Sequence, residues 1–216
     1  MNNILAVLFD ADGTLIDSRE WALKYYFLVA KELGLPEVTH EEFLAVWAIP
    51  WKQLLNALWP GVDVAAFNKA CEKYDQGQSI PAIAGAKKVL YELKKKENFL
   101  SLISNRRRSS LAEKMSEVGM PFNLFDYVQA VDDFPFCKPN PHVFDPVLFL
   151  LSERDIPRSE VVFVGDTLSD LEAARGADIK FIGVLTGGAT KQQFVTAGLD
   201  EAFILESVRD LPKFLT

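Results

Sequence analysis

The stretch that decides the fold is Ile4-Leu5-Ala6-Val7-Leu8-Phe9, followed directly by Asp10-Ala11-Asp12-Gly13-Thr14-Leu15. Six apolar residues without alternation are typical of a strand covered on both faces, as in a parallel sheet between helices. The two carboxylates come after this strand, at the edge where open α/β sheets bind ligands. Because neighbouring anions repel each other, Asp10 and Asp12 imply Mg²⁺, a shared proton, or both.

The composition narrows the class of protein. The chain has 216 residues, of which 49% are hydrophobic, enough for one large domain or a domain with an insert. A net charge of −7 disfavours a nucleic-acid or anionic-membrane binder. Cys71 and Cys137 lack the spacing of a metal or disulfide motif, so we expect reduced thiols. The N-terminal apolar run is too short for a signal sequence, and we expect a cytoplasmic protein with no membrane partner.

The segment from about residue 18 to 80 has helical patterns and no convincing strand. Ser18 is predicted to cap a helix that runs to Leu33, and Thr39 with Glu42 forms a capping box for the next one. Pro50 should end that helix near Trp47. Further helices are predicted over residues 51–58 and 63–79. We therefore expect an inserted helical module, with domains at residues 1–16 and 82–216 (core) and 17–81 (insert).

From Gly85 the patterns of helix and strand alternate. Strands are predicted at residues 99–103, 127–131, 161–164 and 180–185, and helices at 85–97, 109–118, 141–152 and 168–175. Asn140 should cap the third of these helices, with Pro141 at its first position. Such alternation predicts an α/β fold with a doubly wound parallel sheet.

Polar residues follow three later strands at the same topological position as Asp10. They are Ser104-Asn105, Lys138 with its neighbour Pro139, and Gly165-Asp166-Thr167-Leu168-Ser169-Asp170. A parallel sheet brings these strand ends together, so carboxylates, a hydroxyl, an amide and a cation should share one crevice.

These residue types fit phosphoryl transfer. A carboxylate can attack phosphorus and form an aspartyl-phosphate, and either Asp10 or Asp12 could do so while the other moves the proton. Mg²⁺ prefers oxygen ligands and would neutralise charge on both nucleophile and substrate. Ser104 can donate to phosphoryl oxygens, and Lys138 supplies the positive charge that an anionic substrate needs beside four carboxylates.

Together these four motifs resemble those of the haloacid dehalogenase-like hydrolase superfamily, over essentially the whole chain. The helical insert after the first strand looks like the type-1 cap of phosphoglycolate phosphatase-like members. The resemblance implies a Rossmann-like core and a Mg²⁺-dependent phosphatase that hydrolyses a small phosphorylated metabolite, such as phosphoglycolate or a sugar phosphate, through a phospho-aspartate. From the net charge we expect no nucleic-acid partner, and we expect a monomer or homodimer.

The resemblance also implies residue roles. Asp10 would be the nucleophile and Asp12 the acid/base, with Ser104 and Lys138 stabilising the phosphate. The metal would be held by the Asp10 side chain, the Asp12 backbone carbonyl and Asp166, and Asp170 would support the metal shell or Lys138. The candidate substrate-binding residues are Thr14, Ser104, Asn105, Arg106, Lys138, Trp51 and Lys52.

Several alternatives stay open. The insert holds all four tryptophans, and Trp51 could pack in a small helical bundle instead of facing substrate. Arg106-Arg107-Arg108 could form a solvated surface instead of meeting an anion. For the whole protein, the motifs also allow a sugar-phosphate mutase of the same superfamily. A phospho-accepting signalling module shares some of these residue types, but its acceptor lies on a later strand.

Overall fold

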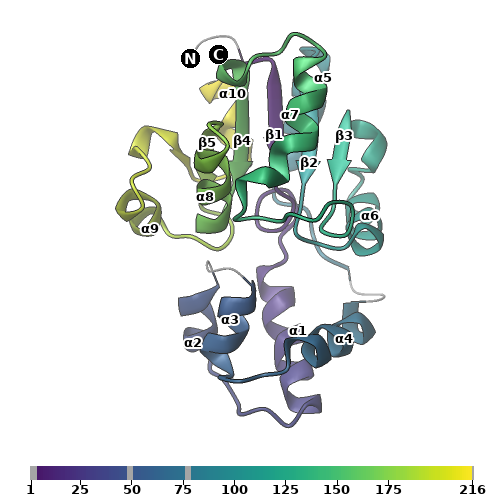
Figure 1. The fold of residues 1–216 in the computed structure, drawn as a ribbon, viewed down its shortest axis with the longest axis vertical. Coiled ribbons are helices and arrows are strands. Elements are labelled where there is room, and N and C mark those ends of the chain that lie inside the picture. Colours follow the sequence, from purple (N-terminus) through teal and green to yellow (C-terminus); the bar gives the residue numbers. More distant parts are fainter. Residues whose placement is uncertain (1–3, 48–50, 76–78, 216) are drawn as a thin grey trace.

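The computed structural model describes residues 4–47, 51–75 and 79–215, and it shows a parallel sheet with a helical insertion (Figure 1). The strands, listed along the chain, are β1 (Ala6–Phe9), β2 (Phe99–Ile103), β3 (Tyr127–Gln129), β4 (Val161–Gly165), β5 (Lys180–Val184) and β6 (Ile204–Leu205). Their order in the sheet is β3-β2-β1-β4-β5-β6, and every pairing is parallel. The chain thus builds outward from β1 in both directions, which confirms the predicted doubly wound fold.

The helices of the described residues fall into two groups. The first four directly follow β1 and form the insertion: α1 (Arg19–Glu32), α2 (His40–Val46), α3 (Trp51–Leu58) and α4 (Val64–Asp75). The others belong to the core, where α5 precedes β2 and the rest follow the later strands: α5 (Ala86–Lys95), α6 (Arg108–Glu117), α7 (Asp145–Ser152), α8 (Leu168–Gly176), α9 (Lys191–Thr196) and α10 (Leu211–Phe214). Short 3₁₀ turns occur at Phe122–Leu124, Pro141–Phe144, Arg158–Glu160, Glu201–Phe203 and Val208–Asp210. Among the described residues, none of these helices has the length and apolar character needed to cross a membrane.

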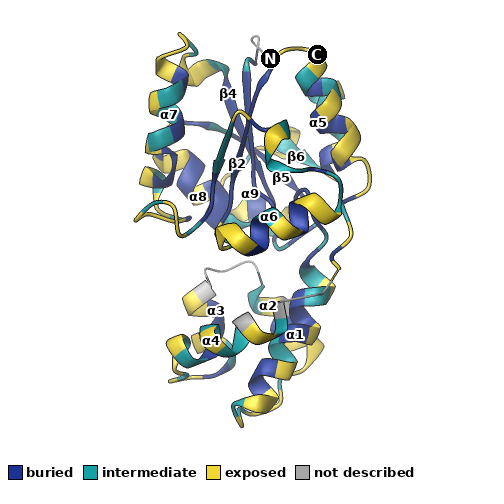
Figure 2. Ribbon diagram, turned by 90° about the vertical axis from the view of Figure 1, so that its right-hand side faces the viewer, coloured by how far each residue is buried: buried dark blue, intermediate teal, exposed yellow. Residues whose placement is uncertain are grey.

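The unbroken apolar run of β1 is explained by two hydrophobic cores. Val7 and Phe9 pack into the core beneath α5, α6 and α10, whereas Ala6 and Leu8 face the core beneath α7, α8 and α9. Because successive side chains of a strand point to opposite faces, both sets of positions must be apolar. Figure 2 shows the strands buried between the two helical layers.

The helices α1 to α4 form a cluster of their own beyond the carboxyl ends of the strands (Figure 1). Its core contains Trp59, which is buried and donates from Nε1 to the carbonyl oxygen of Pro36 at 2.8 Å. The chain enters and leaves this cluster side by side, since Asp17 N donates to Pro81 O at 2.8 Å. The cluster therefore lies where it can cover the strand ends, and the domain boundaries at residues 17 and 81 stay a prediction.

Three predicted elements are present but differ in detail from the prediction. Ser18 precedes α1, but its hydroxyl makes no capping hydrogen bond. The helix expected over residues 141–152 begins as a 3₁₀ turn and becomes α-helical only at Asp145, because Pro146 has no N–H for an α-helical bond to His142. The strand expected over 127–131 ends at Gln129, where Asp133 accepts from Ala130 N at 2.7 Å and turns the chain.

Other local signals were confirmed. Thr39 and Glu42 form the predicted capping box at the start of α2. Asn140 accepts from the backbone N–H of His142 at 2.9 Å, as expected of a cap. The helix predicted over residues 63–79 is α4, which ends at Asp75; residues 76–78 of that prediction lie outside the described part of the chain, as does Pro50.

Candidate active site

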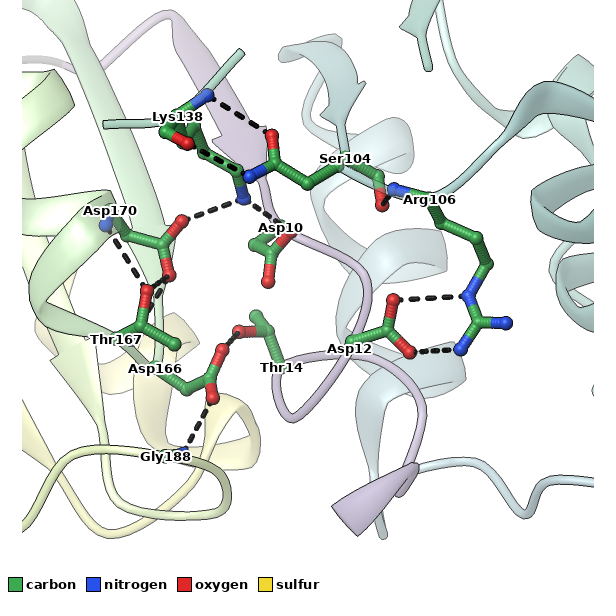
Figure 3. Close-up of polar contacts among 11 residues, drawn as sticks. Asp10, Asp12, Thr14, Ser104, Arg106, Lys138, Asp166, Thr167, Asp170 and Gly188 are labelled. Atoms are coloured by element: carbon green, nitrogen blue, oxygen red, sulfur yellow. Dashed lines mark hydrogen bonds and ion pairs between the residues drawn. The ribbon is translucent and has the colours of Figure 1, made fainter. Parts of the chain in front are cut away.

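The site is built on the carboxyl end of β1. Asp10 is the first residue after the strand, and its backbone N–H donates to Val164 O of β4 at 2.9 Å. Since β1 lies between β2 and β4, the residues that follow all three strands meet here. Figure 3 shows Asp10 among side chains from these loops, as the sequence predicts.

Lys138 is the central cation of the site. Its Nζ lies 2.5 Å from Asp10 Oδ1 and 2.6 Å from Asp170 Oδ1, and the side chains of all three residues are buried. The loop after β3 that carries Lys138 is held by Asn105, whose amide donates to Lys138 O at 2.9 Å and whose Oδ1 accepts from Lys138 N at 3.0 Å. Asn105 thus positions the lysine through its backbone.

Asp166 faces the same space from the end of β4. Its carboxylate accepts from Thr14 Oγ1 at 3.2 Å and from the backbone N–H of Gly188 at 2.7 Å. Gly13 lies against this carboxylate with a φ of +75°, so a side chain there would be strained and would overlap Asp166. The glycine after the two aspartates therefore allows the β1 loop to approach the carboxylate closely.

Asp170 is fixed from two sides. Its Oδ2 accepts from Thr167 Oγ1 at 2.6 Å and Thr167 N at 3.0 Å, completing a capping box at the start of α8. Its other oxygen contacts Lys138. Asp170 therefore both caps a helix and holds the lysine.

The acidic groups have perturbed pKa values. Burial raises the pKa of Asp10 to about 7, with the charge of Lys138 opposing the shift and those of Asp170 and Asp12 adding to it. Burial also raises the pKa of Asp166 well above its ordinary value. For Lys138, burial alone would lower the pKa, but the two carboxylates in contact with it outweigh that effect and raise it. The site carries more negative charge than Lys138 can neutralise.

This excess charge fits a cation. Asp10, Asp166 and Asp170 each offer an oxygen within 4.8 Å of the others, and all three are buried. With all carboxylates ionised, one lysine faces three negative charges in a region shielded from water, which is costly without further positive charge. Oxygen donors of this kind suit a hard divalent cation. The site is therefore a candidate metal centre.

Asp12 points away from this cluster. Arg106 binds its carboxylate with both sides of the guanidinium fork, Nη2 to Oδ1 at 2.6 Å and Nε to Oδ2 at 3.1 Å (Figure 3). Burial alone would raise the pKa of Asp12, but the charge and hydrogen bonds of Arg106 hold it below its ordinary value. The two aspartates of the first motif thus have separate surroundings.

The remaining predicted residues lie at different places. Ser104 is buried beside the site and accepts from Arg106 N at 3.1 Å. Lys52 is exposed on α3, in the helical cluster. Trp51 begins that helix, and its side chain lies outside the part of the molecule that the structure describes. The prediction that these two residues bind substrate stays a prediction.

The sequence reasoning missed the loop after β5. Gly188 donates to Asp166, and Thr186 Oγ1 donates to Gly13 O at 2.6 Å, so this loop fixes both the Asp166 carboxylate and the β1 turn. The run Thr186-Gly187-Gly188 directly follows a predicted strand, as do the other motifs. That position at the same edge of the sheet was the available signal.

Comparison with known proteins identifies the family. Residues 7–184 match the family described as haloacid dehalogenase-like hydrolase. The chain belongs to this family. The structure superposes on that of a haloacid dehalogenase-like family hydrolase from Streptococcus pneumoniae with a TM-score of 0.82, over 100% of both chains at 19% identity. The resemblance read from the motifs is confirmed, and with it the expectation of an enzyme.

Curated relatives point in the same direction. The chain is 27% identical to pyrophosphatase PpaX from Bacillus velezensis, over 96% of this chain and 94% of the relative. It is 27% identical to the phosphoglycolate phosphatase of Pseudomonas putida, over 84% of this chain and 69% of the relative. It also matches Protein SUPPRESSOR OF QUENCHING 1 of Arabidopsis thaliana at 26% identity over 85% of this chain, but spans only 18% of that protein's length.

Proposed function

We propose that this haloacid dehalogenase-like hydrolase is a Mg²⁺-dependent phosphatase that hydrolyses a small phosphorylated metabolite through a phospho-aspartate on Asp10. The observation that carries the proposal is the position of Lys138, which contacts Asp10 and Asp170 beside Asp166. A buried carboxylate beside a fixed ammonium and a cation-binding cluster is equipped to attack a phosphoryl group. The phosphatases among the curated relatives support this choice of reaction.

In the first step, an oxygen of Asp10 attacks phosphorus, and the bond from phosphorus to the leaving oxygen breaks. The electron pair leaves with that oxygen, and Asp12 supplies its proton. Lys138 and Ser104 face the phosphoryl oxygens and stabilise their charge. The product of this step is an acyl phosphate on Asp10 and a free hydroxyl compound.

In the second step, a water molecule attacks the phosphorus of that acyl phosphate. Asp12 takes the proton from the water, and the bond between phosphorus and Asp10 breaks to regenerate the carboxylate. Inorganic phosphate is released. The contact with Arg106 favours the ionised form of Asp12, which can take the proton from the water. In the first step that contact has to open before Asp12 supplies a proton to the leaving oxygen.

The residues present fit a Mg²⁺ site. Asp10 and Asp166 would hold the ion with the backbone carbonyl of Asp12, and Asp170 would support it from its place beside Lys138. When bound, the ion neutralises negative charge on the nucleophile and the phosphoryl group. The helical cluster of α1 to α4 is placed to close over a small substrate and exclude bulk water.

The test is release of inorganic phosphate from a panel of phosphorylated metabolites, with Mg²⁺ and with a chelator. The proposal expects Mg²⁺-dependent release by the unaltered protein and its loss in Asp10→Asn, with circular dichroism showing that the fold is kept. Lys94→Met, which alters a partly exposed ion pair with Asp126, is the control and should keep full activity. Conversion of a sugar phosphate to its isomer without phosphate release would instead indicate a mutase.

A further inference from the structure

We propose that Arg106 recognises a second anionic group on the substrate, a carboxylate or a further phosphate carried on the leaving-group side. This inference rests on the proposed function and extends it to the class of substrate. It starts from the contact between Arg106 and Asp12, a cation and an anion joined by two hydrogen bonds at 2.6 and 3.1 Å. Because Asp12 is the residue proposed to face the leaving oxygen, its partner lies on the leaving-group side.

Arg106 is held in place by more than Asp12. Its Nη1 donates to the hydroxyl of Ser110 on α6 at 2.9 Å. Its guanidinium carbon lies 5.4 Å from the ring centre of Trp21, an aromatic residue of α1 in the helical cluster. Ser110 belongs to the core and Trp21 to the helical cluster. Contacts from both parts of the molecule thus fix the orientation of the guanidinium. The guanidinium of Arg106 therefore keeps its orientation when another anion replaces the Asp12 carboxylate.

The guanidinium group that binds Asp12 is also suited to bind an anion of the substrate. A planar guanidinium binds carboxylates and phosphates through the same pair of parallel hydrogen bonds. The Asp12 side chain is 29% exposed, whereas that of Arg106 is 12% exposed, so the aspartate is the partner that can turn away. A substrate with an anion next to its leaving oxygen can then take the place of the Asp12 carboxylate. A substrate with a neutral group there cannot form these hydrogen bonds.

The neighbouring arginine provides a matched control. Arg107 is exposed where α6 begins, one residue further along the chain. Replacing either arginine by methionine removes one positive charge and keeps most of the length of the side chain. Hydrogen bonds to Asp12 and Ser110 aim the guanidinium of Arg106 at the site. If the two variants differ in their effect on kcat/KM, the cause is therefore the position of the arginine and not the loss of one positive charge.

The experiment measures kcat and KM on three substrates that differ beside the leaving oxygen: 2-phosphoglycolate (a carboxylate), pyrophosphate (a phosphate) and 2-hydroxyethyl phosphate (a neutral hydroxymethyl group). Arg106→Met should lower kcat/KM for at least one anionic substrate about 10- to 100-fold more than for the neutral one, mainly through KM. Arg106→Lys keeps the charge without the fork and should fall between. Arg107→Met should leave the ratio between substrates unchanged.

The outcomes are distinct. A loss confined to 2-phosphoglycolate supports the inference and assigns a carboxylate, and a loss confined to pyrophosphate assigns a phosphate. Equal loss on all three substrates overturns it, because Arg106 would then only position Asp12. Each comparison is a ratio of kcat/KM values for two substrates measured on the same variant. Partial unfolding lowers both values by the same factor and leaves the ratio unchanged. If the unaltered protein releases phosphate from none of the wider panel, the proposed function fails and the inference with it.

Discussion

Lys138 offers the most demanding test of the site's electrostatics. Its Nζ contacts two carboxylates at 2.5 and 2.6 Å, and the side chains of Lys138, Asp10 and Asp170 are only 4%, 8% and 1% exposed. Removing one partner of a buried ion pair leaves an uncompensated charge, at a cost of about 3–5 kcal/mol. We therefore expect Lys138→Met to lower the free energy of unfolding of the metal-free protein by about that amount at pH 8.

The loss should depend on pH. The pKa of Asp10 is already raised to about 7 in the folded protein, and removing Lys138 takes away the main influence that lowers it. A carboxyl whose folded pKa exceeds its unfolded value binds a proton more tightly when folded. Its contribution to stability is present below the unfolded pKa and is lost as the pH rises through the folded pKa. At pH 5 Asp10 is protonated in both proteins, so the variant should lose less stability there than at pH 8.

The assay is urea unfolding of both proteins at pH 5 and pH 8 in the presence of a chelator. Lys94→Met is the matched control, since it breaks a 2.8 Å ion pair with Asp126 in which the lysine is 39% exposed. Such a pair contributes less than about 1 kcal/mol. If Lys138→Met lost no more stability than this control, or lost the same amount at both pH values, the reasoning about uncompensated buried charge would be refuted.

Three further predictions concern other parts of the molecule. Because Gly13 has a φ of +75° and lies against Asp166, Gly13→Ala should cost about 1–3 kcal/mol in urea unfolding and abolish phosphate release, whereas unchanged activity would show that the turn tolerates a side chain. With Asp10 as a Mg²⁺ ligand, as proposed, protons would compete with the ion, so the Mg²⁺ affinity from calorimetry should rise as the pH increases from 5.5 towards 7.5, and a flat profile would exclude Asp10 as a ligand. Trp59→Ala should destabilise the helical cluster by about 3–5 kcal/mol in urea unfolding, because it leaves a cavity and an unpaired Pro36 carbonyl; a loss below 1 kcal/mol would contradict that packing.

Much of the fold follows from local pattern. The apolar run before Asp10 predicts a buried central strand, and the alternation after Gly85 predicts the order of the core elements. These signals are strong because a parallel sheet needs strands that are apolar on both faces. The same topology brings Ser104, Lys138 and Asp166 beside Asp10, as the sequence analysis expects. The polar residues that follow the strands, and their meeting at one edge of the sheet, can thus be predicted from the sequence.

The direction in which each side chain points could not be predicted from the sequence. Arg106 turns to Asp12, whereas Arg108 turns to Asp133, and nothing in a run of three arginines separates them. The choice depends on which carboxylates the folded loops bring within reach. The contact of Gly188 with Asp166 is equally hidden, because a backbone N–H leaves no mark in the residue type. Of these contacts, the one between Arg106 and Asp12 gives the second aspartate of the first motif surroundings different from those of Asp10, which contacts Lys138.

The most direct test of the proposed mechanism is to look for the covalent intermediate. The protein would be mixed with a phosphorus-labelled substrate and Mg²⁺, quenched in acid within milliseconds, and digested for peptide mapping. We expect label on the peptide that contains Asp10, appearing before inorganic phosphate, and no label in Asp10→Asn. Full phosphate release with no label on Asp10 at any time, or label on another aspartate, would contradict the assignment of Asp10 as the nucleophile.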